Sequence, residues 1–193
     1  MRLDPRILQD LAVPFAPKDY VRVTPVAHAA TPLGMGYGDT RFASPTNAFK
    51  VLYLAENLTT SVAEAVVRDR YQGKARRRLH ESEAERWGAT SVAATRPLQL
   101  IDLRTTGLVR LGISTEAARG KAQGQGRKLS QAIHDQTDAD GLLYASRLTA
   151  AACLCVFERA VPVLHATPVA VLVTLPDFVA ALQALNVVLE PTP

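Results

Sequence analysis

Short runs of apolar residues, separated by turn-forming residues, mark the expected strands of this chain. The run at residues 51–55 is apolar at every position, which is typical of a strand buried on both faces. A similar run, LLYAS, follows the turn sequence TDADG. The runs that predict strands are 20–25, 51–55, 98–104, 142–146, 161–166 and 169–175.

Helix signals occur between these runs. The stretch DPRILQDLA, residues 4–12, places Asp4 at the N-cap and Pro5 at the first helical position. Further helices are expected after the possible N-cap residues 59–61, over 128–136, and over 176–185 with Pro176 in the first turn. Residues 108–125 are ambiguous, and we interpret them as a short helix followed by a flexible loop.

The elements alternate without a regular βαβ rhythm, which favours a compact α+β fold with mixed sheets and flanking helices. The length of 193 residues is that of one domain, expected to cover residues 1–193. An apolar fraction of 48% and a charged fraction of 21% are ordinary for a globular protein. The first residues carry scattered charges and no signal-like apolar run, so we expect a cytoplasmic protein with no membrane span.

The net charge of +4 and the basic cluster KARRRLH at residues 74–80 allow a nucleic-acid partner. The acidic stretch ESEAERW follows directly, so a solvated helix of mixed charge is the preferred interpretation of residues 74–86. A small ligand that carries phosphate suits the basic balance equally well. No metal site is expected, because the four histidines are scattered and Cys153 and Cys155 lie in an apolar run as core thiols.

A single carboxylate, Glu64, lies among alanines and valines in the stretch VLYLAENLTTSVAEAVV. Ser61 and Glu64 fit a capping box, in which the glutamate bonds back to the N–H of the cap residue. Glu64 can also pair with Arg68 one turn later. The alternative is that this carboxylate takes part in chemistry.

Three glycines alternate in the loop TPLGMGYGDTRFASPTN, at Gly34, Gly36 and Gly38. The spacing is not G-x-G-x-x-G and the loop does not join a strand to a helix, so a dinucleotide-binding Rossmann motif is rejected. These glycines favour tight backbone turns near something bulky. A serine–histidine hydrolase is also rejected, because Ser146 lies in YASRL and not in G-x-S-x-G.

Four segments in the same order resemble the RES-domain family, the toxins of bacterial Xre/RES toxin–antitoxin pairs. They are YVRVTP, GDTRFAS, VLYLAENLTTSVAEAVV and LSQAIHDQTDADGLLYASRL, and together they span residues 20–157. The resemblance implies a fold similar to ADP-ribosyltransferases and an enzyme that cleaves the nicotinamide–ribose bond of NAD+. One departure is that Ala43 and Ser44 follow the RF pair where many members carry asparagine.

The resemblance places catalytic roles on Arg22, Tyr53, Glu64 and Ser146, and binding of NAD+ on Arg22, Arg41, Tyr53 and Ser146. The chemistry suits these residue types. A carboxylate stabilises the oxocarbenium-like transition state of glycosidic cleavage, and arginine binds phosphate oxygens bidentately. An aromatic face favours a cationic ring. Four residues near the motifs rank lower as pocket candidates: Tyr37, Tyr144, Arg127 and Arg147.

The resemblance therefore implies a toxin that depletes NAD+ by transferring ADP-ribose to water or phosphate. A mono-ADP-ribosyltransferase that modifies a protein is the first alternative, and a non-enzymatic basic binding module is the second. The implied partner is an Xre-type helix-turn-helix antitoxin that covers the site, with a possible homodimer in the complex. NAD+ is the expected substrate, and no metal and no direct nucleic-acid contact are expected.

Overall fold

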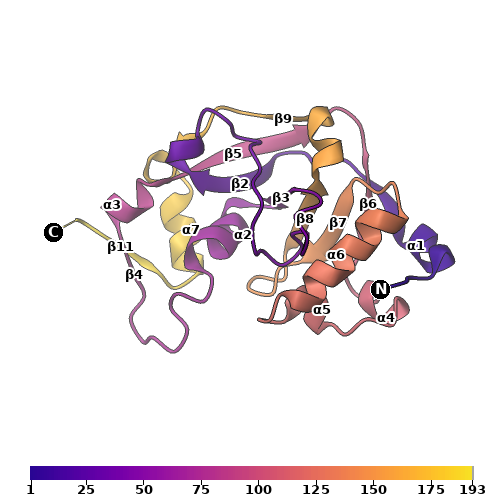
Figure 1. The fold of residues 1–193 in the computed structure, drawn as a ribbon. Coiled ribbons are helices and arrows are strands. Elements are labelled where there is room, and N and C mark those ends of the chain that lie inside the picture. The colour runs from indigo at the N-terminus through magenta and orange to yellow at the C-terminus, as the bar shows by residue number, and fades with distance from the viewer. Residues whose placement is uncertain (193) are drawn as a thin grey trace.

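A mixed β-sheet forms the centre of the molecule in the computed structural model, which describes residues 1–192 except for the side chain of Arg119 (Figure 1). The pair β6–β7 is parallel and the other pairs of this sheet are antiparallel. In spatial order the strands are β1 (Ala12–Phe15), β6 (Leu98–Asp102), β7 (Gly141–Ala145), β8 (Ala152–Phe157), β3 (Val51–Ala55), β2 (Tyr20–Pro25), β5 (Trp87–Ala94) and β10 (Ala170–Val171), with β9 (Leu164–Ala166) also paired to β5. A separate parallel pair joins β4 (Arg78–His80) to β11 (Val188–Glu190).

Helices lie against both ends of this sheet. The longest, α6 (Gly124–Gln136), crosses the face formed by β7 and β8, and α2 (Leu58–Val62) lies beside α7 (Phe178–Ala184) near β2 (Figure 1). The π-helical turn η2 (Ala63–Val67) directly continues α2. The remaining helices are α1 (Pro5–Leu11), η1 (Val26–His28), α3 (Glu81–Ala84), α4 (Gly107–Arg110), α5 (Glu116–Arg119), η3 (Glu158–Val163) and η4 (Leu172–Thr174).

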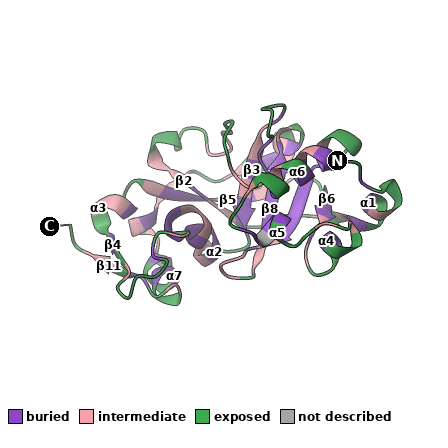
Figure 2. Cartoon of the chain, turned by 60° about the horizontal axis from the view of Figure 1, so that its bottom comes forward, coloured by how far each residue is buried: buried purple, intermediate pink, exposed green. Residues whose placement is uncertain are grey.

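The alternation of side chains along the central strands builds two apolar layers. Leu52, Leu154 and Val156 face one side, where they pack with Leu100 and Leu143. The opposite side packs against α6, and its members include Leu129, Ile133, Leu142, Tyr144, Cys153, Cys155 and Phe157. Figure 2 shows the central strands and the inner side of α2 as buried and the connecting loops as exposed.

The strands β2 and β3 are neighbours in the sheet but pair only where Val21 faces Ala55. Beyond that point the backbone N–H of Val23 donates instead to the hydroxyl of Ser61 in α2, at 3.0 Å. The two strands therefore diverge, and α2 fills one side of the gap. This split in the sheet provides space for a cavity.

The expected α+β architecture with a mixed sheet is confirmed. The helix capped by Asp4 is also confirmed, since its carboxylate accepts from the N–H of Arg6 at 2.8 Å. The strands expected at 20–25 and 51–55 match β2 and β3.

Five local predictions are wrong. Residues 74–86 do not form one mixed-charge helix, because Leu79 is buried in strand β4. Only residues 170–171 of the run 169–175 are strand, and only 164–166 of the run 161–166. Pro176 precedes α7, whose N-cap is Asp177. Helix α6 begins at Gly124, four residues before the expected start.

In residues 1–192, the structure has no helix that is both long and apolar enough to span a membrane.

Candidate active site

A cavity of about 250 Å³ opens where β2 and β3 diverge. Its walls come from β2, β3, β7, β8 and the helix α2–η2. Loop and turn residues at 40–41, 68–69, 121–123 and 147 complete them. Basic side chains outnumber acidic ones on these walls, which favours an anionic ligand. The charged residues that line the cavity are Arg22, Arg41, Arg68, Lys121 and Arg147, with Glu64 and Asp69 as the acids.

Glu64 faces the cavity from the π-helical turn η2. Its Oε1 accepts a hydrogen bond from the hydroxyl of Ser146 at 2.6 Å. The capping box that the sequence left open as an alternative is not formed, because helix α2 begins earlier and its N-cap is Asn57, whose side chain accepts from the N–H of Thr60 at 2.8 Å. Ser61 lies inside the helix, buried against β2. The carboxylate is therefore free of a capping role.

Arg68 does not neutralise this carboxylate. Its Nε donates to the backbone carbonyl of Glu64 at 2.5 Å, and no ion pair joins the two side chains among those found in residues 1–192. The hydroxyl of Ser146 is thus the side-chain donor to the Glu64 carboxylate within that part of the chain.

Ser146 directly follows β7 and is 3% exposed. Its hydroxyl oxygen accepts from the backbone N–H groups of Leu148 and Thr149, at 3.1 and 3.2 Å. With both lone pairs used in this way, the hydroxyl proton points to Glu64. The turn after β7 therefore fixes the orientation of the carboxylate, and Ser146 reaches the cavity through Glu64 instead of lining it.

Arg22 lies in β2 and extends over the glycine loop. Its two terminal nitrogens donate to the carbonyls of Pro32 and Gly34, at 2.9 and 2.7 Å. Burial lowers the pKa of Arg22 to about 10, which leaves the guanidinium charged at neutral pH. The glycine loop, for which tight turns were expected, therefore folds over the Arg22 side chain.

Arg41 lines the cavity from the end of the same loop. Its Nη1 donates to the carbonyl of Gly120 at 2.5 Å, which joins this loop to the segment before α6. Helix α6 lies so close that a Cβ on Gly126 would come within 2.6 Å of the carbonyl oxygen of Arg41. Glycine at this position permits the close approach.

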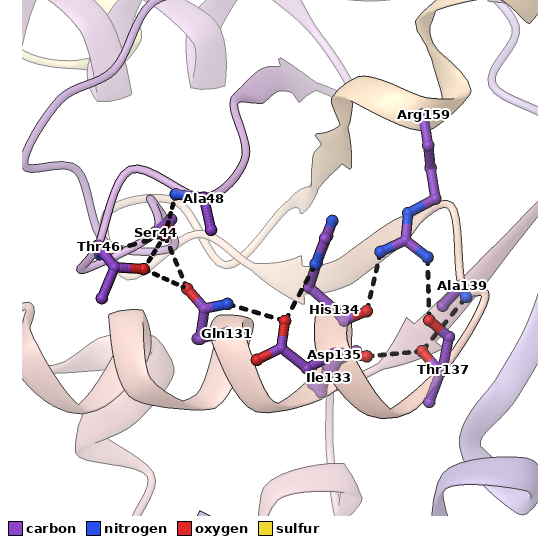
Figure 3. A network of polar contacts seen from close by, with 10 residues as sticks. All are labelled: Ser44, Thr46, Ala48, Gln131, Ile133, His134, Asp135, Thr137, Ala139 and Arg159. Atoms are coloured by element: carbon purple, nitrogen blue, oxygen red, sulfur yellow. Dashed lines mark hydrogen bonds and ion pairs between the residues drawn. The ribbon is translucent and has the colours of Figure 1, made fainter.

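The segment that follows Arg41 is also attached to α6. Ser44 donates to Gln131 Oε1 at 2.7 Å, and Gln131 donates to Asp135 at 2.8 Å (Figure 3). At the other end of the helix, Arg159 donates to the carbonyls of His134 and Thr137, both at 2.9 Å. These contacts hold α6 in place and so support the backbone of Arg41.

Tyr53 lies in β3 with its hydroxyl engaged on both sides. The oxygen accepts from the N–H of Phe42 at 2.9 Å, and the hydroxyl donates to Thr40 Oγ1 at 3.0 Å. Burial raises the pKa of Tyr53 well above its ordinary value, so the phenol is neutral at physiological pH. The ring borders the cavity while the hydroxyl fixes the residues on either side of Arg41.

The structure thus brings all the first-ranked residues to one place. Of the lower-ranked candidates, Tyr144 and Arg147 line the cavity. Burial raises the pKa of Tyr144 well above its ordinary value. Tyr37 is exposed and Arg127 pairs with Asp39 and the carbonyl of Ser44, so neither contributes to the walls.

Three charged residues of the cavity were not proposed from the sequence as ligand-binding groups: Arg68, Asp69 and Lys121. Asp69 accepts a hydrogen bond from Arg147 at 2.6 Å, and Lys121 Nζ donates to Gln72 Oε1 at 3.4 Å. All three stand in turns or loops, where no periodic pattern marks the side that faces a cavity. The basic charge of the loop RGKAQGQGR was the available signal for Lys121.

The cysteines and histidines form no alternative centre. Cys153 borders the cavity, and burial raises its pKa to about 12, so the thiol is protonated. Within residues 1–192, the structure contains no cluster of three or more histidine, cysteine, aspartate or glutamate side chains suited to a metal ion.

Comparisons with known proteins indicate the family and the fold of the chain. A curated relative, the probable toxin y4kH of Sinorhizobium fredii (strain NBRC 101917 / NGR234), is 38% identical over 86 residues, which are 44% of this chain and 67% of that protein. The crystal structure of the M. tuberculosis MbcT–MbcA toxin–antitoxin complex contains a chain of similar fold, with a TM-score of 0.63 and 17% identity over 86% of this chain and 92% of that one. The family model of the RES domain matches residues 16–180, and the chain therefore belongs to the RES domain family.

Proposed function

We propose that this chain is the toxin of a toxin–antitoxin pair and that it consumes NAD+ by cleaving the bond between nicotinamide and ribose. The observation that carries the proposal is the hydrogen bond from Ser146 that holds the Glu64 carboxylate at a cavity lined mainly by basic charged residues among those described. The family membership and the toxin among its relatives support the same reading.

The charges of the cavity suit the charges of NAD+. The diphosphate is anionic and needs donors of fixed geometry, which arginine side chains provide. The reacting ribose becomes positive as the bond from C1′ to the nicotinamide nitrogen breaks, and an adjacent carboxylate stabilises that charge. A site for this reaction therefore needs several cations for the diphosphate and a carboxylate for the ribose. The cavity has arginine side chains for the first and Glu64 for the second.

In the proposed reaction the bonding electrons leave with nicotinamide, which becomes neutral. Glu64 faces the resulting oxocarbenium-like ribose, and Ser146 keeps the carboxylate in a single orientation. Water or phosphate then bonds to C1′, and with water a proton is released to solvent. Tyr53 borders the site as a neutral phenol, where its ring can face the cationic nicotinamide.

The direct test is release of nicotinamide from NAD+ by the purified protein and by Glu64→Gln, with folding checked by thermal unfolding. We expect Glu64→Gln to lose at least about 100-fold in kcat, in keeping with the loss of one preorganised electrostatic group. Glu81→Gln removes an exposed carboxylate outside the cavity and should leave the rate unchanged. A folded wild-type protein that releases no nicotinamide would overturn the proposal.

The products of the same assay identify the acceptor. Free ADP-ribose, ADP-ribose phosphate and labelled protein correspond to transfer to water, phosphate and a protein side chain. If labelled protein is the main product, the chain is a mono-ADP-ribosyltransferase, and transfer of ADP-ribose to water or phosphate is rejected.

The proposed partner is an Xre-type antitoxin that covers the cavity. The related fold in the MbcT–MbcA complex supports a partner of the antitoxin kind. Size-exclusion chromatography of the co-expressed pair should give a complex, and its mass reports whether the toxin is a dimer there. NAD+ consumption by the isolated complex at the full rate of the free chain would contradict a covered site.

A further inference from the structure

Arg68 occupies a backbone position that normally belongs to glycine. Its φ of 39° lies in the left-handed region, with ψ at −127°. The N–H of Arg70 donates to the carbonyl of Val67 at 2.9 Å, which closes a four-residue turn with Arg68 in its second position. A positive φ at that position is typical of a type II′ turn, in which glycine dominates. An arginine there strains the backbone.

Neighbouring contacts maintain this turn. Arg147 donates to Asp69 Oδ1 at 2.6 Å, which ties the turn to the segment after β7. The N–H of Arg68 donates to the carbonyl of Ala63 at 2.7 Å, which ends the π-helical turn. Backbone strain persists where the surrounding structure enforces it, and it is concentrated at binding and catalytic sites. The strained residue here lines the cavity and follows Glu64 by four positions.

The guanidinium of Arg68 has fewer hydrogen-bond partners on its terminal nitrogens than the guanidinium groups of the other arginines that line the cavity. Arg22 has both terminal nitrogens bound to carbonyls, and one terminal nitrogen of Arg41 and of Arg147 is also engaged. Arg68 uses only Nε, toward the carbonyl of Glu64. Among the contacts of residues 1–118 and 120–192, its two terminal nitrogens have no protein partner.

The structure assigns to Arg68 the role of a substrate-binding residue that grips the diphosphate of NAD+ with its two terminal nitrogens. A pair of parallel N–H donors matches two phosphate oxygens, and the Nε contact holds the fork in orientation. The strained turn directly follows the helical segment that carries Glu64, so the carboxylate and the phosphate-binding guanidinium are held by adjacent backbone. This assignment rests on the proposed function and extends it to a residue outside the family pattern noted in the sequence.

The test uses Arg68→Gly, which removes the side chain and gives the turn its preferred residue. We expect KM for NAD+ to rise about tenfold or more, as for loss of a charge-assisted hydrogen-bonded pair, with a smaller effect on kcat. We also expect Tm to rise by about 2 °C or more, because the strain is relieved. Higher stability with weaker substrate binding distinguishes a lost contact from a damaged fold.

Arg68→Lys is the second variant, since it keeps the charge and the strained backbone but not the fork. It should raise KM for NAD+ severalfold at unchanged Tm. Arg70→Gln is the matched control, because Arg70 belongs to the same turn but pairs with Glu83 outside the cavity. That variant should keep the KM of the wild type.

The outcomes separate this assignment from the proposed function. Inorganic phosphate can act as an acceptor, so KM for NAD+ is measured in phosphate-free buffer. If the Arg68 variants show a defect only when phosphate is added, the assignment is overturned. An active wild type with KM for NAD+ within twofold in Arg68→Gly would also overturn it. Inorganic pyrophosphate provides a probe without turnover: its binding should weaken in Arg68→Gly even if the protein cleaves no NAD+, whereas equal binding would overturn the assignment.

Discussion

At the scale of single residues, the structure excludes the capping role that the sequence left open for Glu64. Ser61 and Glu64 have the spacing of a capping box, but Asn57 four residues earlier supplies the cap. Local spacing cannot rank two cap candidates that are one turn apart. What decides is a tertiary contact, because the hydroxyl of Ser61 accepts from Val23 of a neighbouring strand. Glu64 is then available to Ser146.

Ser146→Ala tests whether this hydrogen bond positions the carboxylate. A hydrogen bond to a charged group contributes about 1.5–3 kcal/mol, so we expect kcat for NAD+ cleavage to fall about 10- to 100-fold. KM should change little, because Ser146 acts through Glu64 and does not line the cavity. Steady-state kinetics over a range of NAD+ concentrations separates the two constants.

Ser130→Ala is the matched control for that substitution. Ser130 is fully buried in α6, and its hydroxyl is among the buried side-chain groups of residues 1–192 without a partner. Its loss should leave both constants unchanged. An equal loss of kcat in the two variants would show that removing any buried serine hydroxyl disturbs the fold. The positioning role of Ser146 would then be rejected.

At the scale of elements, β2, β3 and the helix capped by Asp4 were predictable, whereas β4 and β5 were not. Strand β5 reads WGATSVAA, which is rich in small and polar residues, and it becomes a strand because it pairs with β2 on one side and with β9 and β10 on the other. Strand β4 exists because it pairs with β11, more than a hundred residues later. Such elements depend on tertiary pairing, which overrides local propensity.

The start of β7 depends on a buried carboxylate, Asp140. It accepts from both terminal nitrogens of Arg96, at 2.7 and 3.0 Å, and from the N–H of Gln99 at 2.8 Å. Burial alone would raise the pKa of Asp140, but the donors from Arg96 and Gln99 outweigh it and hold the pKa below its usual value. These contacts tie β6 to β7, the parallel pair beside the site.

Asp140→Asn should therefore destabilise the fold in a pH-dependent way. At pH 7 we expect a loss of about 1–3 kcal/mol in the free energy of unfolding, moderated because Arg96 is half exposed. A lowered carboxylate pKa stabilises the fold above the unfolded pKa, and that stabilisation disappears as pH falls through the lower folded value. The difference between wild type and variant should thus shrink below about pH 4. Urea unfolding at pH 7 and pH 3 checks this, and a constant difference would contradict it.

At the scale of the whole molecule, basic residues are grouped at the cavity and in the segment at residues 74–78. Within that segment, Arg77 donates to the carbonyl of Leu185 and Arg78 pairs with Glu190, so part of the cluster stabilises the small β4–β11 sheet. This use weakens the interpretation of the cluster as a nucleic-acid surface. The proximity of the five first-ranked candidates could be expected because short motifs carry them, whereas Arg68 and Lys121 reach the cavity through turns that only the folded chain defines.

Occupation of the cavity should stabilise the whole chain. A ligand that binds only the folded state adds about 2.7 kcal/mol at 100 times its Kd, which corresponds to a rise in Tm of about 5–10 °C for a chain of this size. Glu64→Gln provides the protein for this measurement, since slow turnover preserves the NAD+. Differential scanning fluorimetry with increasing NAD+ should show the rise.

Two further substitutions in the Glu64→Gln background locate the bound NAD+. Arg22→Ala removes a cation from the cavity wall and should abolish most of the rise in Tm, because the resemblance to RES-domain toxins places NAD+ binding on this residue. Lys74→Ala removes the same charge from an exposed position outside the cavity and should keep the rise. If both variants lose it equally, the attraction is a general effect of net charge; if Arg22→Ala keeps it, NAD+ binds elsewhere. Only loss confined to Arg22→Ala places the ligand where β2 and β3 diverge, next to the carboxylate that is proposed to act on it.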